Sequence, residues 1–270
     1  MCIRDRNYSD EKDLSNFKKV NTSSWNTIKD NVYLRLMNAK YIPSYNEDIA
    51  FVKKLDLAIT FSVQEIVTEQ SKKKMLSHML TNQELKDMGI DIDTVYRDTL
   101  QNTAQNRKRR IMTFKEYTIM HSTLYPMLTI PKGMMIGSGG EDVQSCGVLE
   151  DVTYNHENNT EIENILMITN KNDVFGACYM AVPEILEEVY DRFGENFYII
   201  PMSIHCVMCV RSNYVTKNNT KPLYEVEDDI LDTVEDFNDT HNKSWKDILS
   251  YKAYYYFGDD GKFIFPISTH

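Results

Sequence analysis

Residues 162–211 read IENILMITNKNDVFGACYMAVPEILEEVYDRFGENFYIIPMSIHCVMCVR, and they hold the densest apolar runs of the chain. Two of these runs, Ile165–Thr169 and Phe175–Met180, are rich in residues that suit β-strands. The polar residues Asn170–Asp173 lie between them and have the chemistry of a turn. The pattern therefore predicts a β-hairpin over residues 165–180.

A helix is predicted after this hairpin. Pro183 suits a first helical position, because its φ is fixed and its missing N–H is not needed there. Apolar residues then recur at spacings of one, three and four and so form one face: Ile185, Leu186, Val189, Tyr190 and Phe193. Gly194 follows as a typical residue for the end of a helix.

A second hairpin is predicted after the helix. Phe197–Ile200 and Ser203–Val210 are its apolar runs, and Pro201 and Met202 are expected to form the break between them. The stretch thus predicts a central hairpin–helix–hairpin unit within an α+β fold of antiparallel or mixed sheets covered by helices. The helix has to cross over the sheet, in the right-handed sense if the strands that it joins are parallel.

The flanking sequence favours the same fold class. Asn31–Met37 predicts a strand, and so does Leu55–Val63, although this second run is long enough for a helix. Thr81–Glu84 has the spacing of a capping box and predicts a helix start. Aromatic runs on both sides of Gly258–Gly261 predict a C-terminal hairpin.

The domain organisation follows from a less regular stretch, residues 121–160. We expect it to be a connector between an N-terminal α+β lobe, residues 7–120, and a C-terminal α+β lobe, residues 161–270. Its glycine cluster, residues 133–140, lacks the spacing of a phosphate-binding loop, so a flexible connector is the favoured interpretation.

Cys206 and Cys209 match the C-x-x-C pattern, which is typical of redox and zinc sites. Here the pattern lies inside an apolar run, and residues three apart in a strand point to opposite faces of the sheet. The two thiols then cannot share one ion, and no second ligand pair has zinc spacing. We therefore predict buried structural cysteines, no metal site and no cofactor.

The best candidate site is the patch Pro201, Ser203, His205 and Cys206. Ser203 and His205 are two residues apart, so a strand would place them on one face beside the Pro201 break. One interpretation is a polar functional site at a strand entrance. The structural alternative is a serine that caps the turn and a histidine that is hydrogen-bonded to a neighbouring backbone group.

Parts of the chain resemble a known family. The run F-G-A-C-Y…P-E-I-L-E-E…F-G-E-N-F-Y-I-I-P-M-S-I-H, between residues 175 and 205, resembles the signature of a bacterial family, the domain of unknown function 5688 (DUF5688). Similar motifs lie outside this run, at Lys54–Phe61, Asn102-Thr103, Phe237–Thr240 and Ile248–Ser250. The resemblance spans residues 24–257.

Two positions depart from the pattern of that family. Cys206 stands where the family commonly has a glutamate after the histidine, and Met202 stands where it commonly has a serine. If the family's His-Glu pair were catalytic, this chain would lack half of it. The resemblance implies a fold and a bacterial origin among the Firmicutes, and it implies no activity.

Composition sets further bounds on the 270-residue chain. Its net charge of −10 disfavours a broad nucleic-acid surface, because Lys and Arg dominate phosphate binding. Neither a spanning apolar run nor a signal peptide is visible, and five cysteines without framework spacing suggest the reducing cytoplasm. The start Met1–Arg6 is typical of proteins predicted from metagenome assemblies, so we expect an N-terminally truncated family member.

Two charged stretches have both a plain and a functional interpretation. Arg107–Arg110 is the most basic point; a solvated helix end is the plain interpretation, and an anion or nucleic-acid contact is the functional one. Residues 223–239 combine an apolar face with eight carboxylates. These carboxylates lack the spacing of a calcium loop, so they predict the solvated face of an amphipathic helix.

These observations leave three hypotheses. The leading one is a non-catalytic cytoplasmic domain that binds a protein or a small ligand, because no complete catalytic constellation is visible. The rival is a hydrolase-like enzyme with His205 as base and Ser203 or Cys209 as nucleophile. The third is weak nucleic-acid binding through Arg107–Arg110.

Overall fold

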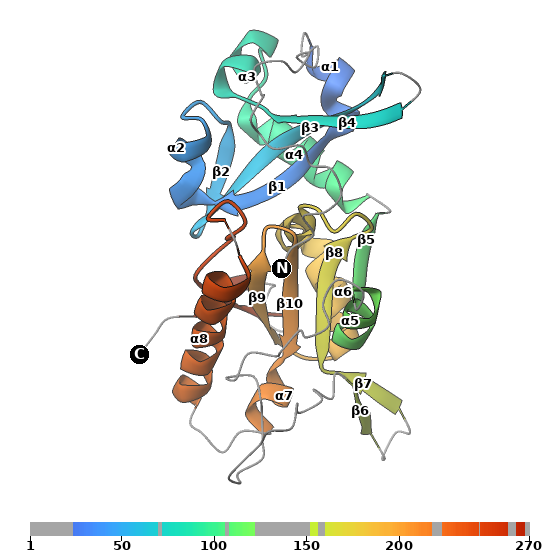
Figure 1. Ribbon diagram of the computed structural model, residues 1–270, viewed down its shortest axis with the longest axis vertical. Helices are drawn as coiled ribbons and strands as arrows, with labels where there is room; N and C mark the ends of the chain where they lie inside the picture. The colour runs from blue at the N-terminus through green and yellow to red at the C-terminus, as the bar shows by residue number, and fades with distance from the viewer. Residues whose placement is uncertain are drawn as a thin grey trace. The chain divides into compact units, whose positions relative to one another are not determined.

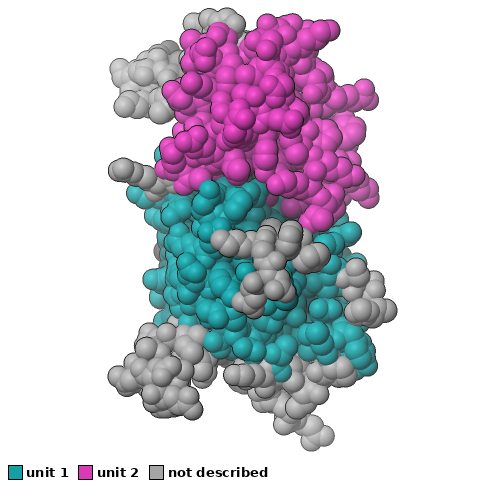
Figure 2. Space-filling model, turned by 180° about the vertical axis from the view of Figure 1, so that it is seen from behind, with its two compact units in different colours: residues 1–2, 108–270 teal, residues 3–107 magenta. Residues whose placement is uncertain are grey.

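The computed structural model describes residues 24–69, 72–105, 108–121, 152–155, 160–217, 223–242, 244–258 and 263–267. The chain divides into two compact units, which are distinguished by colour in Figure 2. Residues 3–107 form the N-terminal unit, and residues 1–2 and 108–270 form the C-terminal unit. The predicted connector, residues 121–160, lies largely outside the described residues, and so does the glycine cluster within it.

The N-terminal unit is built on a four-stranded antiparallel sheet (Figure 1). Its strands are β1 (Val32–Asn38), β2 (Phe51–Lys54), β3 (Leu57–Glu69) and β4 (Lys72–Met79). β3 is the central strand and pairs with each of the others. The strand predicted over Leu55–Val63 is thus confirmed, and it begins at Leu57.

Helices and short turns complete this unit. They are α1 (Trp25–Ile28), α2 (Ile42–Tyr45), α3 (Asn82–Met88), α4 (Ile92–Ala104) and two 3-10 turns, Lys29–Asn31 and Ala39–Tyr41. The predicted capping box is confirmed, because the Thr81 hydroxyl accepts from the Glu84 N–H while the Glu84 carboxylate accepts from the Thr81 N–H. Gly89 then ends α3 at a φ of 64°, where glycine is favoured.

The last two turns of α4 hold the open edge of β1. The Thr103 hydroxyl accepts a hydrogen bond from the Leu34 N–H at 3.0 Å. Asn102 donates from its side-chain amide to the Val32 carbonyl at 3.1 Å and to the Lys29 carbonyl. These two side chains therefore hydrogen-bond to backbone groups of β1 and of the turn before it.

The C-terminal unit is built on a six-stranded sheet in the order β12-β11-β9-β10-β8-β5, with every pair antiparallel. Its strands are β5 (Arg109–Thr113), β8 (Ile165–Asn170), β9 (Phe197–Ser203), β10 (Cys206–Arg211), β11 (Tyr254–Phe257) and β12 (Phe263–Pro266). A separate hairpin joins β6 (Val152–Asn155) to β7 (Thr160–Glu163). The predicted α+β fold with antiparallel sheets is thus confirmed.

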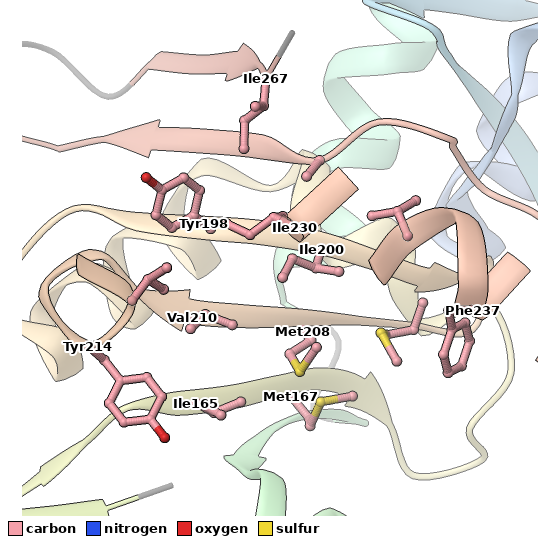
Figure 3. Packing of buried hydrophobic residues seen from close by; sticks show 14 of the residues in the cluster. Ile165, Met167, Tyr198, Ile200, Met208, Val210, Tyr214, Ile230, Phe237 and Ile267 are labelled. Carbon is pink, nitrogen blue, oxygen red and sulfur yellow. The ribbon is translucent and has the colours of Figure 1, made fainter. Parts of the chain in front are cut away.

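The helices of this unit are the 3-10 helix η5 (Gly176–Ala181), α5 (Phe114–His121), α6 (Pro183–Phe193), α7 (Ser212–Lys217) and α8 (Leu223–His241). α8 covers one face of the sheet, where Ile230 packs with Ile200 and Met208 in the main apolar cluster (Figure 3). α6 covers the opposite face, because Phe193 packs on Phe197 and strand side chains alternate. Among the described residues, no helix is long and apolar enough to cross a membrane.

α8 has the predicted amphipathic pattern. Val226, Ile230, Val234 and Phe237 are buried. The exposed acidic residues lie on its remaining surface: Asp232, Glu235, Asp236 and Asp239. The interpretation as a solvated acidic face is confirmed for these four carboxylates, whereas the other four are partly buried: Glu225, Glu227, Asp228 and Asp229.

The first predicted hairpin of the central stretch is wrong. β8 has the expected position, but residues 176–181 form η5 instead of a strand. Phe175 has a φ of 57°, in the left-handed region, and this turns the chain out of the sheet. β9 and β10 form the second hairpin as expected. Because β10 pairs antiparallel with both β8 and β9, these two strands run parallel to each other, and α6 lies in the connection between them.

Candidate functional site

The patch around His205 lies where β9 turns into β10. β9 continues through Pro201 and Met202 to Ser203, and the turn consists of Ile204 and His205. The predicted break at Pro201 is therefore wrong. Pro201 is tolerated in the strand because β11 pairs with β9 only over residues 197–199, so the missing N–H of Pro201 interrupts no bond to β11. Met202 is the extra residue of a bulge, since Val207 pairs with Pro201 and Cys206 with Ser203.

Ser203 and His205 consequently do not share the face of one strand. Ser203 is the last residue of β9 and is fully buried. Its hydroxyl oxygen accepts a hydrogen bond from the backbone N–H of His205 at 3.1 Å. The hydroxyl also lies 3.9 Å from the Cys206 sulfur. Ser203 thus caps the turn, as the structural alternative requires, and the bond reaches the backbone of His205 instead of its ring.

The imidazole of His205 is held on both sides. Its Nδ1 accepts a hydrogen bond from the backbone N–H of Phe175 at 3.0 Å, and the Phe175 ring stacks on it with the centroids 5.5 Å apart. Its Nε2 lies 3.8 Å from Oδ1 of Asp247, in the loop that follows α8. A backbone N–H can only donate, so Nδ1 must be unprotonated, and the hydrogen of the neutral ring lies on Nε2.

Contacts with the backbone of the same turn join it to three other segments. The Thr169 hydroxyl donates to the His205 carbonyl at 3.1 Å, and the Ile204 N–H donates to the Asp247 carbonyl at 2.9 Å. Gly176 lies so close that a Cβ atom there would be 2.6 Å from the His205 carbonyl oxygen. The His205 turn therefore joins β8, η5 and the loop after α8.

Two partners of His205 were missed by the sequence analysis, Phe175 and Asp247. Phe175 was assigned to a strand because its neighbours are apolar, and Asp247 lies 42 positions after the histidine in a polar stretch. The Phe-Gly pair at residues 175–176 was the available signal, because a glycine after a polar turn indicates a close backbone approach.

The cysteine prediction is confirmed where the structure describes the thiols. Cys178, Cys206 and Cys209 form no disulfide, and all three are buried. Cys206 belongs to the cluster under α8, and the phenol of Tyr117 donates to its sulfur at 3.6 Å. Burial raises the pKa of the Cys178 thiol to about 12 and also raises that of Cys209. In the described parts of the chain, no three His, Cys, Asp or Glu side chains come together as a metal site.

The basic stretch does not form a helix end. Arg109 and Arg110 begin β5, and Arg107 lies outside the described residues. The Arg109 guanidinium forms an ion pair with Glu188 of α6 at 2.8 Å. Arg109 therefore already forms an ion pair inside the C-terminal unit.

The motifs near the C-terminus of the chain form a buried hydrogen-bond network. The Asn238 amide donates to the Ser250 carbonyl at 2.8 Å. The Ser250 hydroxyl accepts from the Tyr254 phenol at 2.9 Å. The Asn242 amide donates to Asn238 at 2.8 Å and to the carbonyl of Met202, beside the His205 turn, at 3.1 Å. Asn242, which follows the first of these motifs, thus links Asn238 to the end of β9.

Comparison with known proteins agrees with the resemblance in the sequence. A family model described as "Family of unknown function (DUF5688)" matches residues 3–257 of the 270-residue chain. No curated protein and no solved structure matches the chain. Because the match covers most of its length, the chain belongs to the DUF5688 family.

Proposed function

We propose that this chain is a non-catalytic binding domain for a protein or a small ligand. The supporting observation is the use of the His205 and Ser203 side chains within the fold. Nδ1 of His205 accepts from the Phe175 N–H, Nε2 faces Asp247, and the Ser203 hydroxyl accepts from the His205 N–H. A general base needs a ring nitrogen within hydrogen-bond reach of the proton that it removes, and this ring offers none to Ser203.

The hydrolase alternative has one observation in its favour. A carboxylate beside a histidine is the arrangement that orients a catalytic imidazole, and Asp247 lies beside His205. In such a group the second ring nitrogen faces the nucleophile. Here the second nitrogen accepts from the Phe175 backbone, and Ser203 is fully buried. The arrangement therefore favours a structural role for the pair.

A fluorophosphonate probe, which modifies activated serines, separates the two functions. We expect the full chain to show no modification at Ser203 by peptide mass spectrometry, the same result as for Ser203→Ala. Modification of Ser203 that disappears in His205→Asn would establish the hydrolase and contradict the proposal.

The binding function needs a positive test of its own. We expect a screen of small molecules and basic or acidic peptides to find a compound that raises the melting temperature saturably. Mass spectrometry should recover this compound unchanged after prolonged incubation. Recovery of a cleaved product would contradict the non-catalytic proposal.

We also propose a cytoplasmic location in a bacterium. Three unbridged thiols, those of Cys178, Cys206 and Cys209, support a reducing compartment. Nucleic-acid binding through Arg107–Arg110 is the weakest of the three hypotheses, since Arg109 is paired with Glu188.

A further inference from the structure

The His205 ring is held by a hydrogen bond that only one of its protonation states can make. The Phe175 N–H donates to Nδ1 at 3.0 Å, and this requires a lone pair on that nitrogen. A protonated imidazole carries hydrogens on both nitrogens. Its Nδ1–H would then point at another donor, and the bond to Phe175 would be lost.

The same protonation strengthens the contact on the other side of the ring. Nε2 lies 3.8 Å from Oδ1 of Asp247, too far for a hydrogen bond but within ion-pair distance. A positive charge on the ring adds a Coulomb attraction toward this carboxylate. The neutral ring is therefore held by Phe175, and the charged ring is drawn toward Asp247.

The segment that loses its hydrogen bond is strained. Asp173 has a φ of 51° and Phe175 a φ of 57°, both in the left-handed region that disfavours residues with a Cβ. Such conformations persist only where the surrounding contacts hold them. For Phe175 these contacts include the bond to His205 and the stacking of the two rings.

Other charged and titratable groups face this site from each neighbouring element. Asp247 comes from the loop after α8. Asp173 comes from the turn after β8, and its carboxylate lies 3.4 Å from the Thr169 hydroxyl, which donates to the His205 carbonyl. From α5, Tyr117 reaches the adjacent Cys206 thiol. Of these groups, the Asp247 carboxylate lies beside the ring and has the sign that stabilises a charged imidazole.

We propose that His205 is a pH-sensitive switch, in which protonation exchanges its hydrogen bond from Phe175 for an ion pair with Asp247 and releases the Phe175 amide, while Asp173 and Val174 keep their hydrogen bonds to Asn170. The change is local, because the hydrogen bonds that pair β9 with β10 do not involve the His205 ring. The switch would couple the pH to the conformation of the segment between β8 and α6.

Residue-resolved NMR of the labelled full chain from pH 8 to pH 5 tests this switch. The chain has six histidines, so a global pH profile cannot isolate His205. We expect the Phe175 amide resonance to shift with the same midpoint as the His205 ring. We also expect its protection from hydrogen exchange, corrected for the intrinsic rate, to fall roughly fivefold, while the Tyr198 and Met208 amides stay protected.

Two variants serve as controls. In His205→Asn, the amide oxygen can accept from Phe175 in place of Nδ1 but does not titrate, so the protection of Phe175 should be independent of pH. In Asp247→Asn, the charge that attracts the protonated ring is absent, so no ion pair can replace the lost hydrogen bond to Phe175. Constant protection of Phe175 while the wild-type ring titrates would overturn the switch. An equal pH-dependent loss in His205→Asn would overturn it as well.

Discussion

Gly176 lies against the backbone of His205, and a Cβ atom at position 176 would be only 2.6 Å from the His205 carbonyl oxygen. The same atom would lie 2.7 Å from Cα of Thr169 and 2.9 Å from the Asn170 nitrogen. All three neighbours are backbone atoms, which cannot move aside as the end of a flexible side chain can. The glycine of the Phe-Gly pair is therefore required by this close contact between η5, β8 and the β9–β10 turn.

Gly176→Ala should destabilise the C-terminal unit by about 2–4 kcal/mol, because the added methyl group forces backbone shifts in a packed region. Each unit contains one of the two tryptophans, Trp25 or Trp245. Denaturant unfolding followed by Trp245 fluorescence in a Trp25→Phe background reports on the C-terminal unit alone.

Gly194→Ala is the matched control for this substitution. Gly194 has a φ of 68°, but a Cβ there would meet nothing within 4 Å. Only the cost of the left-handed backbone remains, about 1 kcal/mol. Equal losses in the two variants would show that the contact with His205 carries no energy of its own.

Thr103→Val should destabilise the N-terminal unit by about 1–3 kcal/mol. Valine has nearly the shape of threonine but leaves the buried Leu34 N–H without its acceptor. Unfolding followed by Trp25 fluorescence in a Trp245→Phe background measures the loss. Gln101→Ala, at an exposed position of the same helix, should change the stability by less than about 0.5 kcal/mol. A similar small effect of Thr103→Val would contradict the role assigned to the α4–β1 contact.

Glu84 should make the N-terminal unit sensitive to acid. Burial opposes its ionisation, but the hydrogen bonds and charge of His78 and the bonds from Thr81 outweigh it and lower its pKa from 4.5 to about 2. A carboxyl with a lowered folded-state pKa contributes stability that is fully present above pH 4.5 and is lost as the pH falls toward 2.

Glu84→Gln keeps the capping-box geometry and removes this titration. We expect the variant to be less stable than the wild type at pH 7 by about 1 kcal/mol, a value reduced for partial solvent exposure, and the difference should vanish near pH 2. Urea unfolding at several pH values, followed by Trp25, measures it. A difference that stays constant over this pH range would contradict the assignment.

The described thiols should be inert in the folded protein. With Cys2 and Cys146 replaced by serine, only Cys178, Cys206 and Cys209 remain, and all three are buried. Burial raises the pKa of Cys178 and of Cys209, so little thiolate forms at neutral pH. Iodoacetamide should modify none of them before unfolding and all of them in denaturant. Rapid native modification of Cys209 would support the hydrolase alternative.

Most helices and strands of the fold were predicted from periodic or local patterns in the sequence. α6 and α8 follow from apolar spacing, and the capping box at Thr81 is a contact between near neighbours in the sequence. The error at residues 175–180 arose because η5 is as apolar as a strand: all five residues from Gly176 to Met180 are buried. The helical form of η5 depends on the positive φ of Phe175 and on the tight contact at Gly176. Neither feature produces a repeating pattern of apolar residues in the sequence.

The site was predicted only in part for a similar reason. Ser203 and His205 were found because they are only two residues apart in the sequence, but their roles depend on partners from distant segments. Phe175 is 30 residues away from His205. The loop with Asp247 reaches the turn after the whole length of α8. Such pairings are set by the sheet order, which a single sequence does not specify.

The position of the proton on the neutral His205 ring tests the central claim most directly. That claim requires Nδ1 to accept a structural hydrogen bond and therefore to carry no proton. Nitrogen-15 NMR at pH 8 distinguishes the two neutral tautomers of each imidazole. We predict the Nε2–H form for His205, with Nδ1 accepting from Phe175. A ring with its proton on Nδ1 would contradict the account, because Nδ1 could then not accept a hydrogen bond from the Phe175 N–H.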